Sequence, residues 1–187
     1  RWGVNYIYGV GAVLPAFESL GLDMGMPAVH RAVKWIILHQ NPDGGWGESC
    51  ASYVDSAYRG RGPSTASQTA WALLALLAAG KGAHPATRRG VDHLIRTQQG
   101  SGCWNEPYFT GTGFPGYGFG RRRDRYLDPD EPEYQGSELS SGFMINYHMY
   151  RNYWPLTALG RYRSFFGEES APDESIPRAH RGYSIIQ

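Results

Sequence analysis

One stretch of the chain occurs twice, and this repeat limits the fold more than any other feature. The first copy, RAVKWIILHQNPDGGW, covers residues 31–46, and the second, RGVDHLIRTQQGSGCW, covers residues 89–104. The copies keep a constant offset of 58 residues, and Pro27 recurs as Pro85 at the same offset. A period of this length is typical of stacked supersecondary units, because one unit alone cannot bury its apolar face.

Each copy has the pattern of an amphipathic helix followed by a turn. Val33, Ile36 and Ile37 form an apolar stripe at helical spacing, and the second copy repeats it. Pro27 suits the first turn of the helix, where its missing N–H is not needed. Asn41 and the proline and glycines that follow predict the end of the helix.

A glutamine and a tryptophan close each copy, Gln40 with Trp46 and Gln98 with Trp104. The glutamine continues the apolar stripe by one turn, so a buried amide there needs partners. We expect it to bond the free backbone groups at the helix end, with the tryptophan ring beside the same junction. Ordinary core helices explain either copy alone, but they do not explain two copies in one register.

The helices alternate in character along the chain. Residues 64–80 predict a helix that begins near Ser64, is apolar on every side over most of its length and is therefore buried all round. Residues 1–22 predict an earlier apolar helix, in which Pro15 marks a bend or a start. The order buried, half-exposed, buried, half-exposed is what a toroid of paired helices needs, so we expect an all-α fold.

Residues 143–166 predict a last helix with an aromatic face. Four rings lie on that face at spacings of three or four residues: Phe143, Tyr147, Tyr150 and Trp154. Such a stripe is usually core. Three of these rings carry a hydroxyl or an N–H group, however, which suits the wall of a cavity better than a dry core.

The loop over residues 41–63 contains three carboxylates, Asp43, Glu48 and Asp55. A loop of this length tends to be functional, and the three carboxylates are candidates for an acid–base group. Caps of local turns are the interpretation we favour, because Asp43 and Glu48 lie where carboxylates commonly serve that purpose.

We expect one domain over residues 1–166 and a polar tail over residues 167–187. Residues 117–141 interrupt the domain with arginines, acids and prolines, which indicates a solvated insertion. Because Phe114 and Phe143 flank this insertion, we expect it to fold over one end of the site.

Composition excludes several classes of protein. The net charge of +1 gives no electrostatic case for nucleic-acid binding, and the apolar run over residues 70–79 is too short to span a membrane. Cys50 and Cys103 form neither a disulfide framework nor a zinc pattern with histidine, so no metal or other cofactor is expected and reducing cytosol is the default compartment. Arg1 stands inside sequence that looks structured, so we expect further residues upstream.

Five segments resemble signatures of one protein family, in the order in which the family has them. They are RWGVNYIYG, NPDGGWGESCASY, GRGPSTASQTAWAL, GTGFPG and YHMYRNYWPLTALGRY. The repeated glutamine and tryptophan resemble the QW motif of the same family. Roughly over residues 1–116 and 142–163, the chain therefore resembles the C-terminal portion of a squalene–hopene cyclase, in the triterpene cyclase family.

This resemblance implies about half of a six-hairpin α/α toroid and a cyclase that works without a metal. Such an enzyme protonates a terminal alkene of squalene and guides carbocations into the fused rings of hopene or hopanol. Aromatic faces stabilise these cations by about 2 kcal/mol or more per desolvated ring and do not readily bond to them. The resemblance also implies a peripheral protein on the cytoplasmic side of a bacterial membrane, and it is compatible with a homodimer.

The aromatic residues that stabilise cations in the family match six positions of this chain: Trp2, Tyr8, Phe114, Phe143, Tyr147 and Tyr150. Tyr8 would lie near the end of the site where protonation occurs. The family's proton donor lies in an Asp-X-Asp-Asp motif, which none of the 187 residues forms, and the DPDE sequence at residues 128–131 lies in the insertion, in the wrong order relative to the repeats. We therefore expect the isolated chain to be inactive.

Three alternatives stay open from the sequence. Another class II cyclase would act on oxidosqualene or on a shorter polyprenyl, and the donor environment that distinguishes it lies outside these residues. A protein prenyltransferase β-subunit shares the toroid but needs zinc ligands, for which Cys50 and Cys103 show no grouping. A non-catalytic helical-repeat binding module would place its aromatic residues on one exposed concave face.

Overall fold

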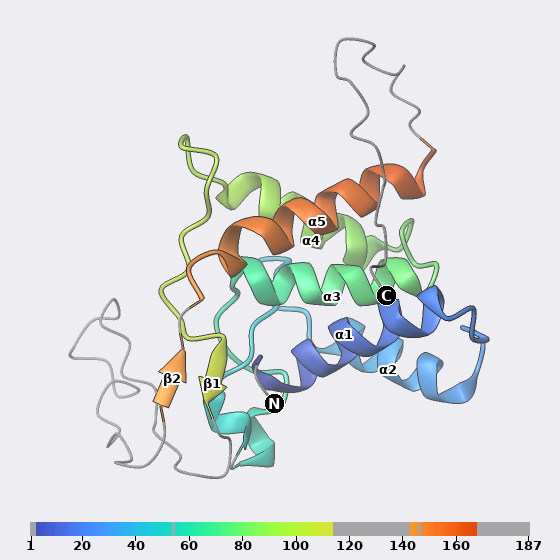
Figure 1. Ribbon diagram of the computed structural model, residues 1–187, viewed down its shortest axis with the longest axis horizontal. Helices are drawn as coiled ribbons and strands as arrows, with labels where there is room; N and C mark the ends of the chain where they lie inside the picture. The colour runs from blue at the N-terminus through green and yellow to red at the C-terminus, as the bar shows by residue number, and fades with distance from the viewer. Residues whose placement is uncertain (1–2, 54, 114–142, 146, 168–187) are drawn as a thin grey trace, which may run out of the picture.

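The structure, a computed structural model, describes residues 3–53, 55–113, 143–145 and 147–167 of the chain (Figure 1). The α-helices in these ranges are α1 (Asn5–Ser19), α2 (Pro27–Leu38), α3 (Ala66–Ala78), α4 (Pro85–Thr97) and α5 (Tyr150–Phe165). Two short 3₁₀-helices, η1 (Cys50–Tyr53) and η2 (Ser56–Tyr58), lie in the long loop after α2. The strands β1 (Gly111–Gly113) and β2 (Phe143–Ile145) form one antiparallel pair, so the described fold is helical apart from this small ribbon.

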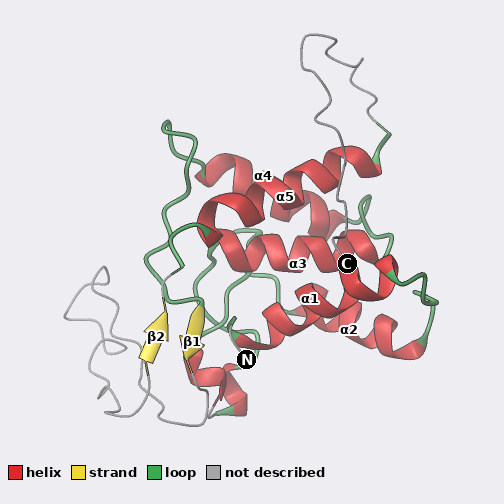
Figure 2. Cartoon of the chain, in the orientation of Figure 1, coloured by secondary structure: helices red, strands yellow, loops and turns green. Residues whose placement is uncertain are grey.

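Helix α3 is the centre of the fold, with α1 packed along one side and α5 along another (Figures 1 and 2). All of its residues are buried, as its apolar sequence predicts. The helix begins slightly later than expected, because the Ser64 hydroxyl donates to Asp43 and does not cap the helix. Thr65 is the cap instead, and its hydroxyl oxygen accepts a hydrogen bond from the Gln68 N–H at 3.2 Å.

The repeat helices α2 and α4 each bury one face, but the third residue of the expected stripe is not buried: Ile37 is half-buried and Ile95 is 61% exposed. The buried residues of α2 are Val29, Val33 and Ile36, and α4 buries the equivalent positions Val91 and Leu94. Both helices begin at a proline, Pro27 and Pro85, which stands in the first turn. The side chains away from these faces are largely exposed, so both helices form the outer part of the described structure.

Helix α1 is less buried than its apolar sequence predicts. Its buried residues are Ile7, Gly11 and Leu14. Val13 and Leu20 are exposed, because within the described ranges the helices that pack on α1 cover only one of its faces. Pro15 neither ends nor starts the helix, which continues through it to Ser19.

The expected helix over residues 143–166 is wrong at its N-terminal end. Residues Phe143–Ile145 are extended and pair with β1, and α5 begins only at Tyr150. The β ladder gives the backbone of these residues the partners that a helix would otherwise supply. Phe143 and Tyr147 therefore do not lie on a helical face shared with Tyr150.

The contact between α1 and α3 leaves no room for a side chain at Gly11. A Cβ there would lie 2.7 Å from the Cβ of Trp71 and 2.8 Å from its carbonyl oxygen, whereas a Cβ at Gly9 would have no atom within 4 Å. We predict that Gly11→Ala lowers the free energy of unfolding by about 1–3 kcal/mol through overpacking. Gly9→Ala, the control in the same helix, should raise it by up to about 1 kcal/mol through helix propensity. Urea unfolding measures both, and equal effects would contradict the contact.

Candidate active site

The first repeat junction joins the end of α2 to the start of α4. Gln40 Nε2 donates to the carbonyl of Gly44 in its own turn and to the carbonyl of Ala86 in α4, both at 2.8 Å. Its Oε1 accepts a hydrogen bond from Arg89, also in α4. One side-chain amide thus satisfies two backbone carbonyls and links the two repeat units.

The tryptophan of each copy bonds back to the helix that precedes it. Trp46 Nε1 donates to the Ile36 carbonyl of α2, and Trp104 Nε1 donates to the Leu94 carbonyl of α4, both at 2.8 Å. Both indole rings are fully buried. The donor and the acceptor keep the 58-residue offset, so the sequence repeat is also a repeat of geometry.

The second junction reaches its neighbour by a different contact. Gln98 Nε2 donates to the Gly102 carbonyl at 2.8 Å, which reproduces the first bond of Gln40. Gln98 is exposed, and within the described ranges it makes no bond to a further helix. The backbone N–H of Trp104 donates instead to Asn152 Oδ1 of α5 at 3.4 Å.

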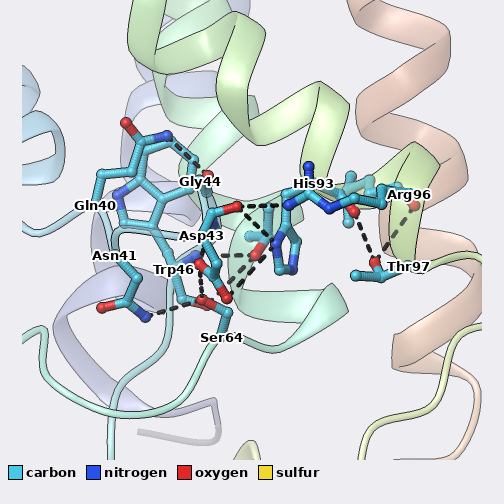
Figure 3. Close-up of polar contacts among 12 residues, drawn as sticks. Gln40, Asn41, Asp43, Gly44, Trp46, Ser64, His93, Arg96 and Thr97 are labelled. Carbon is cyan, nitrogen blue, oxygen red and sulfur yellow. Dashed lines mark hydrogen bonds and ion pairs between the residues drawn. The ribbon is translucent and has the colours of Figure 1, made fainter.

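Asp43 caps the turn after α2 and ties that turn to α4 (Figure 3). Its Oδ1 accepts hydrogen bonds from the Gly45 N–H at 2.9 Å and from the Ser64 hydroxyl at 2.8 Å. From α4, Arg96 donates to the Asp43 carbonyl oxygen at 2.8 Å, and His93 Nδ1 lies 3.7 Å from Asp43 Oδ2. Because the Ser64 hydroxyl donates to the carboxylate, these contacts are not those of a serine activated by histidine. The cap role agrees with the interpretation favoured from sequence.

A buried glutamate follows each repeated tryptophan. Glu48 and Glu106 stand at the same 58-residue offset, and each is 2% exposed. Glu48 Oε2 accepts the backbone N–H groups of residues 5–7 at 2.8 to 3.1 Å, and Glu106 accepts the Ser67 N–H at 2.7 Å. These N–H groups lie at the N-termini of α1 and α3, where the positive end of the helix dipole also stabilises a negative charge. The repeat unit therefore extends to this glutamate, and sequence analysis did not single out Glu106.

Six side chains from separate parts of the chain form what is called the aromatic cluster below: Tyr8, Trp71, Tyr147, Tyr150, Tyr153 and Trp154. Trp71 of α3 is 1% exposed. It meets the ring of Tyr8 from α1 edge to face at a centroid distance of 5.0 Å and the ring of Tyr150 from α5 at 5.8 Å. Tyr147, just before α5, stacks on Tyr150 at 4.4 Å.

Two tyrosines of this cluster, Tyr147 and Tyr150, have raised pKa values. Burial raises the pKa of Tyr150 to about 12, and the neighbouring Tyr153, Tyr147 and Tyr8 add to the effect. Burial also raises the pKa of Tyr147, with a further contribution from Tyr8. At neutral pH Tyr147 and Tyr150 are therefore neutral phenols.

The structure brings together three of the six predicted site residues, Tyr8, Tyr147 and Tyr150. Trp2 and Phe114 lie outside the described residues, and so do the insertion over residues 117–141 and the tail from residue 168 onward. Phe143 is described through its backbone in β2 alone.

The backbone segments next to these residues are neighbours. Gly3 forms an antiparallel bridge with Gly111, and Gly113 pairs with Phe143 across the ribbon. The Tyr53 hydroxyl donates to the Gly3 carbonyl at 2.7 Å and holds the same segment from η1. Gly3, β1 and β2 therefore meet at one place.

Trp71, Tyr153 and Trp154 complete the cluster but were not among the predicted site residues. Trp154 was assigned to the aromatic stripe of the last helix, whereas Trp71 lies in a helix that the sequence marks only as buried. The sequence feature that could have identified Trp71 is that it is the one aromatic residue of α3, ASQTAWALLALLA. A large ring there needs a small neighbour on the adjacent helix, and Gly11 is that neighbour.

Two features are absent from the residues that the structure describes. No three histidine, cysteine, aspartate or glutamate side chains there are close enough to hold a metal ion. No helix in the same ranges has the length and apolar character needed to cross a bilayer.

Replacement of Glu48 tests its role at the start of α1. We predict that Glu48→Gln lowers the free energy of unfolding by about 1–3 kcal/mol, because a charge-assisted acceptor of three N–H groups becomes neutral. Asp55→Asn, at the exposed cap of η2, is the control and should change it by less than about 0.5 kcal/mol. Urea unfolding at pH 7 compares them, and a loss for Glu48→Gln no larger than the control would rule out the cap.

Tyr150 should make the stability fall at alkaline pH. Its folded-state pKa of about 12 lies above the unfolded value of 10.0, so its contribution is complete below pH 10 and is lost as the pH rises toward 12. We predict that Tyr150→Phe makes the decline between pH 10 and 12 shallower, while Tyr58→Phe, at an exposed tyrosine outside the cluster, leaves it unchanged. Unfolding midpoints in urea across this range measure the slope. An unchanged slope in Tyr150→Phe would refute the assignment.

Comparison with known proteins agrees with the resemblance. The family described as squalene-hopene cyclase C-terminal domain matches residues 1–126 and 120–164. The squalene–hopene cyclase of Alicyclobacillus acidocaldarius is 48% identical over 163 residues, covering 87% of this chain and 22% of that protein. The corresponding enzyme of Bradyrhizobium diazoefficiens is 44% identical over 167 residues, covering 88% and 21%.

A dammaradiene synthase of Dryopteris crassirhizoma is 38% identical over 178 residues, covering 88% of this chain and 22% of that protein. The chain thus spans about a fifth of the length of the curated relatives it matches. Because the family match covers most of the chain and these relatives share well over a third of their aligned residues with it, the chain belongs to the squalene–hopene cyclase family and corresponds to its C-terminal domain.

Proposed function

We propose that these residues form part of the active-site wall of a squalene–hopene cyclase, and that the full-length protein cyclises squalene to hopene or hopanol. The aromatic cluster is the observation that carries this proposal. Helix α1 contributes Tyr8, the segment before α5 contributes Tyr147 and α5 contributes Tyr150, and all three lie in one connected set of rings around Trp71.

The proposed reaction explains why the wall consists of rings. Protonation of a terminal alkene starts a series of hydrocarbon cations, each of which needs stabilisation without a nucleophile or a base nearby. A desolvated ring face supplies about 2 kcal/mol or more to a nearby cation, and about 1.4 kcal/mol corresponds to a tenfold change in rate. The raised pKa of Tyr150 favours the neutral phenol, which does not compete for the cation as a phenolate would.

The hydrogen bonds of the buried Glu48 support the same proposal. Glu48 lies in the loop after α2, and its Oε2 accepts the N–H groups at the start of α1, the helix that carries Tyr8. Its Oε1 has no partner among the described residues. A carboxylate used in this way holds the N-terminus of α1 in place. The proton donor must then come from a part of the protein other than these 187 residues, which form no Asp-X-Asp-Asp sequence.

A cyclase with a different substrate or product is the second candidate. The relative at 38% identity that is named a dammaradiene synthase favours it, because the alignment with that protein covers 88% of this chain. Both candidates use a cation-stabilising wall, so the described rings support them equally. The identity of the product distinguishes them.

Turnover by the full-length protein tests the proposal. We predict that it converts squalene to hopene or hopanol, and that Tyr150→Leu lowers kcat about tenfold or more, because a π face worth about 2 kcal/mol is lost. Tyr150→Phe keeps the face and should retain most of the activity. Gas chromatography with mass spectrometry identifies and counts the products from squalene and from oxidosqualene in parallel.

The isolated chain of 187 residues, which has no Asp-X-Asp-Asp motif, should form no cyclised product and serves as the negative control. Tyr58→Leu removes an exposed tyrosine outside the cluster and should keep the wild-type rate. Cyclisation of oxidosqualene alone would favour the second candidate. Absence of any cyclised product from the full-length protein with either substrate would exclude both.

A further inference from the structure

We propose that Trp71 is a positioning residue, whose ring sets the orientation of Tyr8 and Tyr150 without itself touching the substrate. This inference rests on the proposed function, because it concerns the rings that would face the cation. It is carried by the packing around one side chain of α3.

Trp71 is the ring that connects the two sides of the aromatic cluster. It contacts Tyr8 of α1 at 5.0 Å and Tyr150 of α5 at 5.8 Å, with interplanar angles of 71° and 82°. Both contacts are of the edge type that aromatic pairs prefer. At 1% exposure Trp71 is buried beneath its partners, whereas Tyr8 and Tyr150 are each only partly buried.

The backbone on the α1 side cannot move independently of Trp71. Gly11 stands one turn after Tyr8, and a Cβ there would lie 2.7 Å from the Cβ of Trp71. The ring of Tyr8 in turn lies against Gly3, where an added Cβ would come within 2.5 Å of it. A smaller side chain at residue 71 would therefore free Tyr8 to rotate while the helices keep their spacing.

Hydrogen bonding does not hold the Trp71 ring in place. Among the described residues its Nε1–H has no acceptor. Trp46 and Trp104, in contrast, both donate to helix carbonyls. A buried N–H without a partner is unusual. Because Trp71 gains no hydrogen bond here, its role must come from the packing of its ring against Tyr8 and Tyr150.

Displacement of a reacting or stabilising group by about 1 Å can cost on the order of 100-fold in rate. Trp71 acts through Tyr8 and Tyr150, so its loss should change the course of the cation cascade more than it changes substrate binding. The alternative is that Trp71 is an ordinary core tryptophan. Trp46 provides the matched control, because it is also fully buried and the ring contacts that define the aromatic cluster do not include it. Its Nε1–H donates to the Ile36 carbonyl.

The test compares Trp71→Phe, Trp71→Leu and Trp46→Phe in the full-length protein with squalene, at a temperature where circular dichroism shows all of them folded. We expect Trp71→Leu to lower kcat about tenfold or more with KM within about twofold, and to raise the share of partly cyclised products. Trp71→Phe should retain most of the wild-type kcat and most of the wild-type product ratio. Trp46→Phe should lower the Tm but keep the wild-type product ratio. A wild-type product ratio in Trp71→Leu, or the same shift in Trp46→Phe, would overturn the assignment.

A second measurement needs no turnover and separates this inference from the proposed function. The effect of Tyr150→Phe on the decline of stability between pH 10 and 12 should shrink in the Trp71→Leu background and persist in the Trp46→Phe background. If it persists in both, Trp71 does not set the environment of Tyr150. If the wild-type protein cyclises nothing, the proposed function fails, and this measurement still decides whether Trp71 orients Tyr150.

Discussion

The close approach of α1 to α3 is the constraint on which the rest of the described structure depends. Gly11 lets the backbone of α1 lie directly against Trp71, and α3 is buried on every side, so it has no free face along which to shift. Close-packed interiors transmit a displacement because they contain few voids to absorb it. The places of Tyr8 on α1 and Tyr150 on α5 are therefore set from one central helix, and the proposed cation-facing wall takes its geometry from that helix.

The repeat unit supplies the polar half of the design. In the first unit Trp46 satisfies the Ile36 carbonyl near the end of α2, and Gln40 satisfies the carbonyls of Gly44 in the following turn and of Ala86 in α4. Glu48 satisfies N–H groups at the start of α1. Backbone groups left free in a buried region would cost free energy, and in a site for carbocations they would also compete for positive charge. Because long polar side chains bond the backbone groups at the helix ends, these groups are not free to compete with the aromatic faces of the cluster for a cation. The second unit repeats the bond of its tryptophan, Trp104, to α4 and that of its glutamate, Glu106, to the start of α3. Gln98 bonds to the Gly102 carbonyl in its own turn.

Most of the helical pattern was predictable because its causes are local. Prolines in the first turn, apolar stripes at helical spacing and glycines at the exit depend on residues a few positions apart. The ribbon of β1 and β2 was missed because its two strands lie on either side of the insertion, and β1 is the sequence Gly-Thr-Gly, which has no preference for a strand. Glu106 was missed for a related reason, since its partner Ser67 belongs to a helix much earlier in the chain.

The sequence by itself determined the repeat, the positions of the helices other than the start of α5, the family and the candidate tyrosines of the site. These features follow from local periodicity and from residue identity. The tertiary structure decided which of those rings meet. Trp71 joins Tyr8 to Tyr150 only because α1 and α5 pack on α3 with those faces turned toward it. Side-chain contacts between helices depend on the rotation and spacing of whole elements, and no pattern within one helix specifies them.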